Sequence, residues 1–81
     1  DYRTIALEHH KSECVVCKFD LVFEIHHRDK DHSNNDPMNL IPLCPNHHRM
    51  AHMNLYCDEI EKNIQQYLGD GLGTRGSFAR N

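Results

Sequence analysis

The chain has 81 residues, of which 38% are hydrophobic and none is tryptophan, so it can build only one small core. Nine basic and twelve acidic residues leave a net charge of -3, which argues against a protein that binds nucleic acid through a broad basic surface. Small domains often add disulfides or a structural metal to a weak core, and four cysteines and eight histidines are available as ligands. The composition therefore points to a metal.

The first residues lack the basic and apolar regions of a signal peptide, and no apolar run approaches the length of a membrane span. We therefore expect no contact with a membrane, and a cytoplasmic location or another reducing compartment inside the cell. Because the chain does not begin with methionine, we expect it to be a domain of a longer protein.

Residues 1–11 favour a helix that leads into the cysteine pair of Cys14 and Cys17. Residues 19–25 are rich in Val, Phe, Leu and Ile without Gly or Pro, which predicts a strand ending at two histidines. Residues 28–39 are polar and rich in Asp and Asn, so we expect a loop made of local turns.

Residues 40–43 predict a second short strand, of edge type because Pro42 cannot donate to a ladder. Pro45 is tolerated in a first helical turn, so a helix is expected to start there. After an interruption at 54–57, a second amphipathic helix is predicted, because apolar residues recur every four positions behind Asp58 and Glu59. These apolar residues are Ile60, Ile64 and Leu68.

The domain is expected to occupy residues 1–68, because Gly69 follows the last apolar residue of that helix. Residues 69–81 contain all four glycines of the chain and show no apolar period. We interpret them as a flexible C-terminal tail or a linker.

Two short motifs predict a structural zinc ion: Cys14 and Cys17 form a C-x2-C pair, and Cys44 and His47 form a C-x2-H pair. Zinc prefers four tetrahedral thiolate and imidazole ligands, and a two-residue gap lets one turn present two of them. Two disulfides in a secreted protein are the alternative. We interpret Cys57 as a small buried hydrophobic residue, with a ligand role in place of His47 as the second possibility.

The remaining histidines suggest a second site. His26 and His27 end the first strand and should point to opposite faces, while His48 and His52 should share one face of a helix. Asn39 adds an amide oxygen that could ligate a cation or orient a neighbour. Three further histidines are interpreted as solvated surface residues: His9, His10 and His32.

The order of these motifs resembles the HNH endonuclease family. The likeness runs from Cys14 to His52 and rests on His26-His27, on the segment 35–44 and on His47-His48. It implies an α+β fold with a small ββα-metal, treble-clef-like core at residues 14–52, stabilised by zinc and flanked by helices. Residues 1–68 would then form the nuclease domain.

The same resemblance implies roles for the second set of residues. His27 would be the general base, and Asn39 would orient it or help ligation. One catalytic divalent cation would be held by His26, His48 and His52. Many family members carry Asp at the position of His26, and an imidazole there makes Mn²⁺, Ni²⁺, Co²⁺ or Zn²⁺ candidates beside Mg²⁺.

The implied function is metal-dependent hydrolysis of the phosphodiester bonds of DNA. Arg28, Lys30 and Arg49 flank the site residues and could contact phosphates, or they could form an ordinary solvated face. Because the net charge is negative, a further domain is expected to supply targeting. The alternative is a zinc-stabilised module that binds nucleic acid or protein without cutting it.

Overall fold

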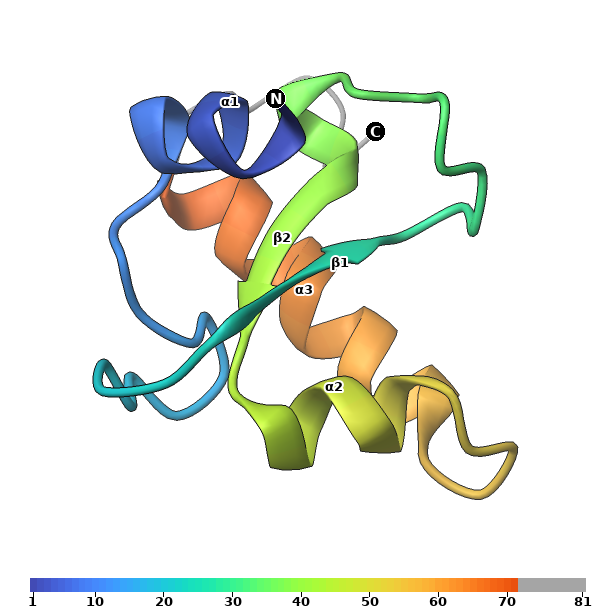
Figure 1. The fold of residues 1–81 in the computed structure, drawn as a ribbon. Helices are drawn as coiled ribbons and strands as arrows, with labels where there is room; N and C mark the ends of the chain where they lie inside the picture. The colour runs from blue at the N-terminus through green and yellow to red at the C-terminus, as the bar shows by residue number, and fades with distance from the viewer. Residues whose placement is uncertain (72–81) are drawn as a thin grey trace.

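Residues 1–71 are described by the structure, a computed structural model, and they form helices around a two-stranded antiparallel sheet (Figure 1). In chain order the elements are α1 (Tyr2–His9), β1 (Glu24–His27), the 3-10 helix η1 (Pro37–Asn39), β2 (Leu40–Leu43), α2 (Pro45–Ala51) and α3 (Cys57–Gly71). Within the described part of the chain, no helix has both the length and the apolar character to cross a membrane. The α+β class predicted from the sequence is confirmed.

The register of the two strands decides which way each histidine points. His26 lies opposite Ile41, and His27 lies opposite Leu40. Residues directly opposite one another in an antiparallel pair share a face, and consecutive residues alternate between faces. The side chains of His26 and His27 therefore leave β1 on opposite faces, as the sequence predicts.

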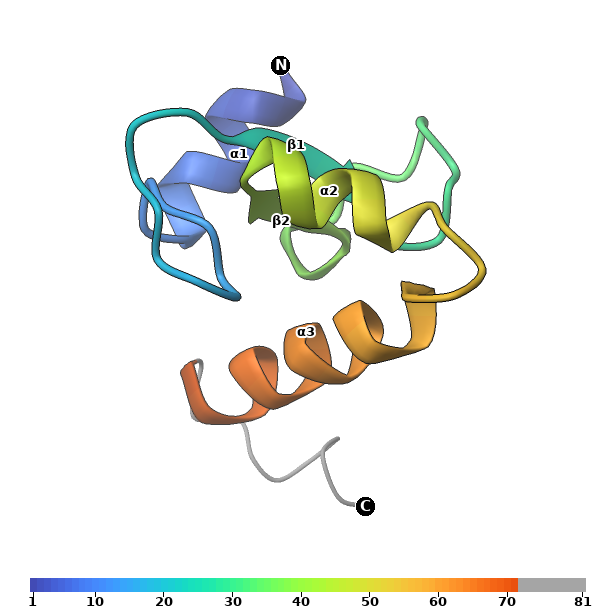
Figure 2. The ribbon, with the colours of Figure 1, turned by 90° about the horizontal axis from the view of Figure 1, so that it is seen from below.

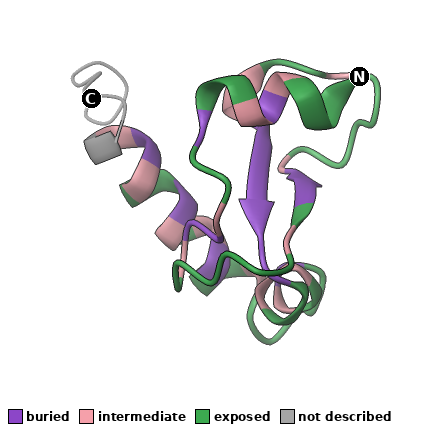
Figure 3. Cartoon of the chain, turned by 60° about the vertical axis from the view of Figure 1, so that its left-hand side comes forward, coloured by how far each residue is buried: buried purple, intermediate pink, exposed green. Residues whose placement is uncertain are grey.

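Helices cover both faces of the sheet, so α1 and α3 lie on opposite sides of the strands (Figure 2). α1 covers one face, where Ala6 packs with Ile25 and Leu40. α3 covers the other face through the buried stripe Ile60, Ile64 and Leu68, which packs with Ile41 and Leu43. β2 is buried along its length between the two layers (Figure 3).

The helices follow from local signals in the sequence. In α1, the side chain of Asp1 caps the first turn by accepting from the backbone N–H of Thr4 at 2.9 Å. α2 starts at Pro45 as predicted. α3 continues to Gly71 instead of ending after Leu68. Residues 72–81, the rest of the predicted tail, lie outside the described residues.

The predicted strand over residues 19–25 is wrong over residues 19–23, because β1 starts only at Glu24. Glu24 pairs with Leu43, the last residue of β2, and the chain turns into α2 two residues later at Pro45. Residues before Glu24 therefore have no strand to pair with. They form an irregular segment in which Leu21 is 80% exposed. The apolar composition of this segment therefore does not indicate a buried strand.

Candidate functional site

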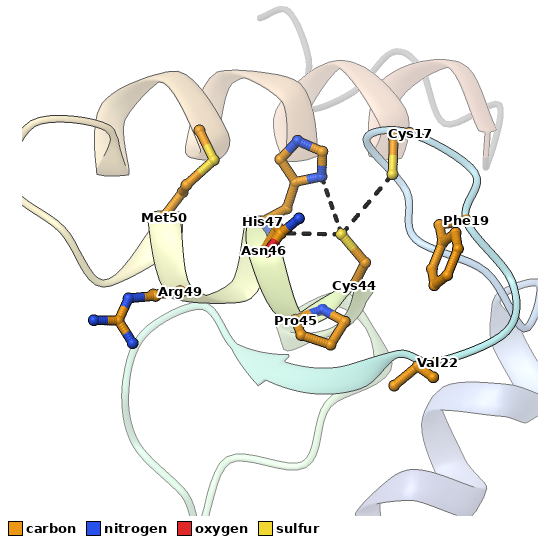
Figure 4. A pocket seen from close by; sticks show the side chains of 9 residues that line it. All are labelled: Cys17, Phe19, Val22, Cys44, Pro45, Asn46, His47, Arg49 and Met50. Atoms are coloured by element: carbon orange, nitrogen blue, oxygen red, sulfur yellow. Dashed lines mark hydrogen bonds between the residues drawn. The ribbon is translucent and has the colours of Figure 1, made fainter.

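The predicted zinc ligands come together between the segment before β1 and the start of α2. Cys14, Cys17, Cys44 and His47 each offer one ligand atom, and these four atoms all lie within 4.8 Å of one another. Cys44 is the N-cap of α2, and its sulfur accepts from the backbone N–H of His47 at 3.5 Å. Figure 4 shows the ring of His47 and the sulfur of Cys17 directed toward Cys44.

The separations within this cluster match those of ligands around one zinc ion. Tetrahedral zinc bonds place two sulfur atoms about 3.8 Å apart, and a sulfur and a nitrogen about 3.5 Å apart. Cys17 Sγ lies 3.9 Å from Cys44 Sγ, and His47 Nδ1 lies 3.3 Å from Cys44 Sγ and 3.5 Å from Cys14 Sγ. These four residues can hold a metal ion such as zinc.

The environment of Cys14 favours the thiolate that binds metal. Burial alone would raise the pKa of this thiol, but backbone N–H groups of Cys44, Cys17 and Val16 and the ring of His47 lower it from 9.0 to about 7. Thiolates are the form that binds zinc, so less free energy is needed to deprotonate this ligand.

The cysteines are all free thiols, and Cys57 is not part of the cluster. Disulfide sulfurs lie about 2.05 Å apart, so the separations above are those of ligands and not of a bridge. Cys57 is the first residue of α3 and is only half-buried, with its sulfur 3.8 Å from the carbonyl oxygen of Asn54. The prediction of a buried hydrophobic role for Cys57 is therefore wrong.

A second cluster joins β1 to the C-terminal half of α2. The ligand atoms of His26, His48 and His52 lie within 4.8 Å of one another. Their ring centroids form a nearly equilateral triangle, with separations of 5.4 Å, 5.2 Å and 5.1 Å. His52 is the C-cap of α2 and not one of its helical residues. Its ring nevertheless lies beside that of His48, as the four-residue spacing predicts.

His26 carries the clearest sign that this cluster fits a cation. Only 4% of His26 is exposed, and its Nδ1 atom is buried without a hydrogen-bond partner. Burial, and then the neighbouring rings of His48 and His52, lower its pKa from 6.5 to about 4. The ring is therefore neutral at physiological pH and has a lone pair available, which is the state that ligates a metal.

Glu24, the first residue of β1, contacts the same cluster. Its carboxylate accepts from Nδ1–H of His48 at 2.6 Å, which leaves the lone pair of that ring on Nε2. A carboxylate bound to the outer nitrogen of a metal-ligating histidine fixes the tautomer and orientation of the ring. Glu24 lies two residues before His26 on the same strand face, so strand periodicity could have identified it in the sequence.

His27 lies on the other face of β1, beside α1. Tyr2 meets its ring edge-on at 5.0 Å, and His32 stacks on it at 4.8 Å with an interplanar angle of 14°. Oδ1 of Asn35 lies 3.3 Å from its Nε2 atom. His27 is 7% exposed, so the neighbouring side chains cover most of the ring.

Asn39 holds the loop between the strands together, and its side-chain hydrogen bonds go to loop residues and not to His27. Its Oδ1 accepts from the backbone N–H of Asp29 at 3.0 Å. Its Nδ2 donates to the carboxylate of Asp29 at 3.0 Å and to the carbonyl oxygen of Asn34 at 2.9 Å. The side chain of Asn39 therefore fixes the conformation of this loop.

Comparison with protein-family models, with curated proteins and with solved structures found no match.

Two side chains are engaged in ways that the sequence did not predict. His10 is buried, not solvated: Nε2 donates to the carbonyl oxygen of Pro37 at 2.9 Å, and Nδ1 accepts from the hydroxyl of Tyr67 at 2.8 Å. Arg28 forms an ion pair with Glu61 and donates to the carbonyl oxygen of Met38 at 3.2 Å. Its guanidinium is thus occupied within the domain.

Other expectations stand as predicted. His9 and His32 are exposed, as are Lys30 and Arg49, the two remaining basic residues that flank the clusters. Short side-chain turns fill the loop after β1, where Asp29 and Asp31 accept from backbone N–H groups two residues ahead. This pattern agrees with the turn-rich loop expected from the sequence.

Proposed function

We propose that this domain is a metal-dependent endonuclease that hydrolyses phosphodiester bonds of DNA, with β1, β2 and α2 as a ββα-metal, treble-clef-like core. The observation that carries the proposal is the triangle of His26, His48 and His52, in which the buried Nδ1 of His26 has no hydrogen-bond partner. Three protein ligands leave a cation open to a further ligand, as catalytic sites require.

The two clusters would have different tasks. The cluster of three cysteines and one histidine would hold a structural zinc ion with all four positions filled by protein. The cluster of three histidines would hold the catalytic cation, either Mg²⁺, Mn²⁺, Ni²⁺, Co²⁺ or Zn²⁺. When bound there, a divalent cation supplies Lewis-acid stabilisation of charge on phosphoryl oxygens and on the leaving 3′ oxygen. Nitrogen ligands favour the later transition metals over Mg²⁺.

The side chains of the domain would share the remaining work. His27 accepts a proton from the water that attacks phosphorus, which is a general-base role suited to an imidazole at neutral pH. Glu24 keeps His48 in the tautomer that points its lone pair at the cluster. Lys30 and Arg49 are exposed and can contact the flanking phosphates, whereas Arg28 is committed to Glu61.

The charge of the chain bears on how DNA would be found. With a net charge of -3, the domain has little attraction for DNA beyond the neighbourhood of its metal ions. We therefore propose that targeting comes from a separate domain. Free thiolate ligands also favour a reducing compartment inside the cell.

A zinc-stabilised binding module is the second candidate, and the exposed apolar segment before β1 favours it. Leu21 and Val22 are 80% and 54% exposed. With Phe19, Val22 also lines a pocket beside Cys44 and His47 (Figure 4). Such a surface could receive a partner protein without any cleavage chemistry.

Relaxation of supercoiled plasmid DNA separates the two candidates. The zinc-loaded chain is stripped of other metals, and each candidate cation is added back singly, with the His27→Ala variant alongside. The nuclease predicts metal-dependent relaxation by the wild type that the variant lacks. If no cation supports cutting by a folded, zinc-loaded chain, the proposed nuclease is wrong and the binding module is favoured.

A further inference from the structure

One hydrogen bond defines the protonation of the His27 ring. Oδ1 of Asn35 lies 3.3 Å from Nε2 of His27. With the Asn35 amide oriented in this way, its oxygen accepts from Nε2–H, and we assign the proton of the neutral ring to Nε2. The neutral ring then keeps its lone pair on Nδ1, which makes Nδ1 the atom that can accept a proton from water.

The other neighbours of His27 fix the plane of the ring but do not distinguish its edges. His32 stacks on one face at 4.8 Å, and Tyr2 contacts the ring edge-on at 5.0 Å. Such aromatic contacts are nearly unchanged when an imidazole turns by half a rotation, because both orientations present the same ring plane. The hydrogen bond to Asn35 is therefore the contact that selects one edge.

Asn39 places Asn35 through the backbone. Its amide donates to the carbonyl oxygen of Asn34 at 2.9 Å and to the carboxylate of Asp29 at 3.0 Å. Oδ1 of Asn34 in turn accepts from the backbone N–H of Asp36 at 3.2 Å. Asn35 thus lies between two residues that the loop holds in place.

We propose that Asn35 is a positioning residue: it holds Nε2–H of His27 and thereby presents Nδ1 to the attacking water. Asn39 acts one step further away, by fixing the backbone next to Asn35. This inference rests on the proposed function, because it assigns His27 as the base. It identifies Asn35 as the side chain through which the loop acts on that base.

NMR of the ring protons of the zinc-loaded 81-residue chain tests the hydrogen bond without any cleavage. The variants are Asn35→Ala, which removes the acceptor, and Asn35→Asp, which replaces the amide oxygen with a carboxylate oxygen and so keeps an acceptor. Asn54→Ala is the matched control, because Asn54 is exposed between α2 and α3. At about pH 8 the Nε2 proton of His27 should exchange with water at least about tenfold faster in Asn35→Ala alone.

Kinetics of plasmid relaxation test the positioning role. Asn35→Ala should lower kcat by about tenfold to a hundredfold with KM unchanged, because a misplaced base slows only the chemical step. Asn35→Asp should recover most of that loss. Unchanged zinc content and melting temperature in each variant show that the fold is kept.

Several results would overturn the inference. They are a ring proton on Nδ1 in the wild type, wild-type proton exchange in Asn35→Ala, or a wild-type kcat in that variant. A raised KM with an unchanged kcat would also overturn it, since Asn35 would then bind substrate instead of placing the base. If no cation supports cutting by the wild type, the proposed function is wrong and Asn35 has no catalytic role. The NMR measurement then still shows whether Asn35 accepts a hydrogen bond from Nε2–H of His27.

Discussion

The two candidate metal clusters depend on the same seven-residue helix but differ in surroundings and ligands. The first contains Cys14 and Cys44, which are 0% and 5% exposed and belong to the main core. The second combines the buried His26 with His48 and His52 at the more accessible C-terminal end of α2. The first cluster offers four ligand atoms and the second offers three, and each includes one exposed residue, Cys17 in the first and His52 in the second.

This difference in the number and chemistry of the ligands is the basis on which we propose a structural role for the first cluster and a reactive role for the second. Thiolates in a core join segments distant in sequence, here residues 14–17 and the start of α2. Imidazoles near a surface leave room for water and a phosphate. Since His47 and His48 are neighbours on α2, loss of the first cluster should also disturb the second.

The largest effect should come from breaking the first cluster with Cys44→Ser. Zinc bound by such ligands contributes about 10 kcal/mol or more of apparent free energy, which exceeds the total stability of about 5 kcal/mol expected for so small a domain. We expect loss of cooperative thermal unfolding, measured by circular dichroism, with loss of bound zinc. Cys57→Ser is the matched control and should melt like the wild type. A Cys44→Ser variant that melts normally without zinc would contradict this role.

The second largest effect concerns His27, the proposed base, and leaves the clusters intact. His27→Ala should reduce the rate of plasmid relaxation by about 10²- to 10⁴-fold, the usual contribution of a general base. Because the ring of His27 is buried against Tyr2 and His32, the melting temperature should fall, so the rates are compared at a temperature at which the variant is folded and keeps its zinc. His9→Ala, an exposed histidine on α1, is the control. Cutting at the wild-type rate by His27→Ala would remove this residue from the mechanism.

A smaller effect is expected from the carboxylate that supports the second cluster. Glu24→Ala should weaken Co²⁺ binding at the histidines by about 10- to 100-fold, because His48 loses the group that fixes its tautomer. Titration followed by cobalt absorption measures this affinity with zinc held in the first cluster. Glu8→Ala, an exposed glutamate on α1, should bind cobalt as the wild type does. Equal affinity in Glu24→Ala would show that Glu24 does not tune the site.

The smallest effect is a pH dependence of stability in the absence of a second cation. Burial, followed by the rings of His48 and His52, lowers the pKa of His26 to about 4, so the unfolded chain takes up a proton first as pH falls. Stability from the neutral ring is thus present above about pH 6.5 and is lost as pH falls toward 4. Urea unfolding of the zinc-loaded wild type should show a steeper decline than His26→Gln. Equal slopes would mean that His26 does not titrate in this window.

The sequence predicted the parts of the fold that local patterns govern. β2 has the predicted bounds, and the stripe Ile60, Ile64 and Leu68 is buried on α3. The opposite directions of His26 and His27 follow from the two-residue period of a strand. The grouping of the four candidate ligands of the first cluster follows from motif spacing.

The remaining errors arise from contacts between distant segments. An apolar run over residues 19–23 looks like a strand, but pairing partners end where Pro45 begins α2. His10 is buried against Tyr67, which lies 57 residues away in the sequence, and no local pattern predicts such a pair. The ion pair of Arg28 with Glu61 is equally non-local. The hydrogen bonds of Asn39 to Asp29 and Asn34 are likewise not indicated by any pattern in the sequence.

The central claim is that the histidine cluster, and not the cysteine cluster, provides the catalytic cation. It is tested most directly by titrating Mn²⁺ or Ni²⁺ into zinc-loaded wild type and His48→Ala while following plasmid relaxation and metal binding together. The account predicts that cutting by the wild type rises with occupancy of the second cluster, and that His48→Ala retains zinc but neither binds the second cation nor cuts. Equal cutting by both proteins with zinc alone would contradict it.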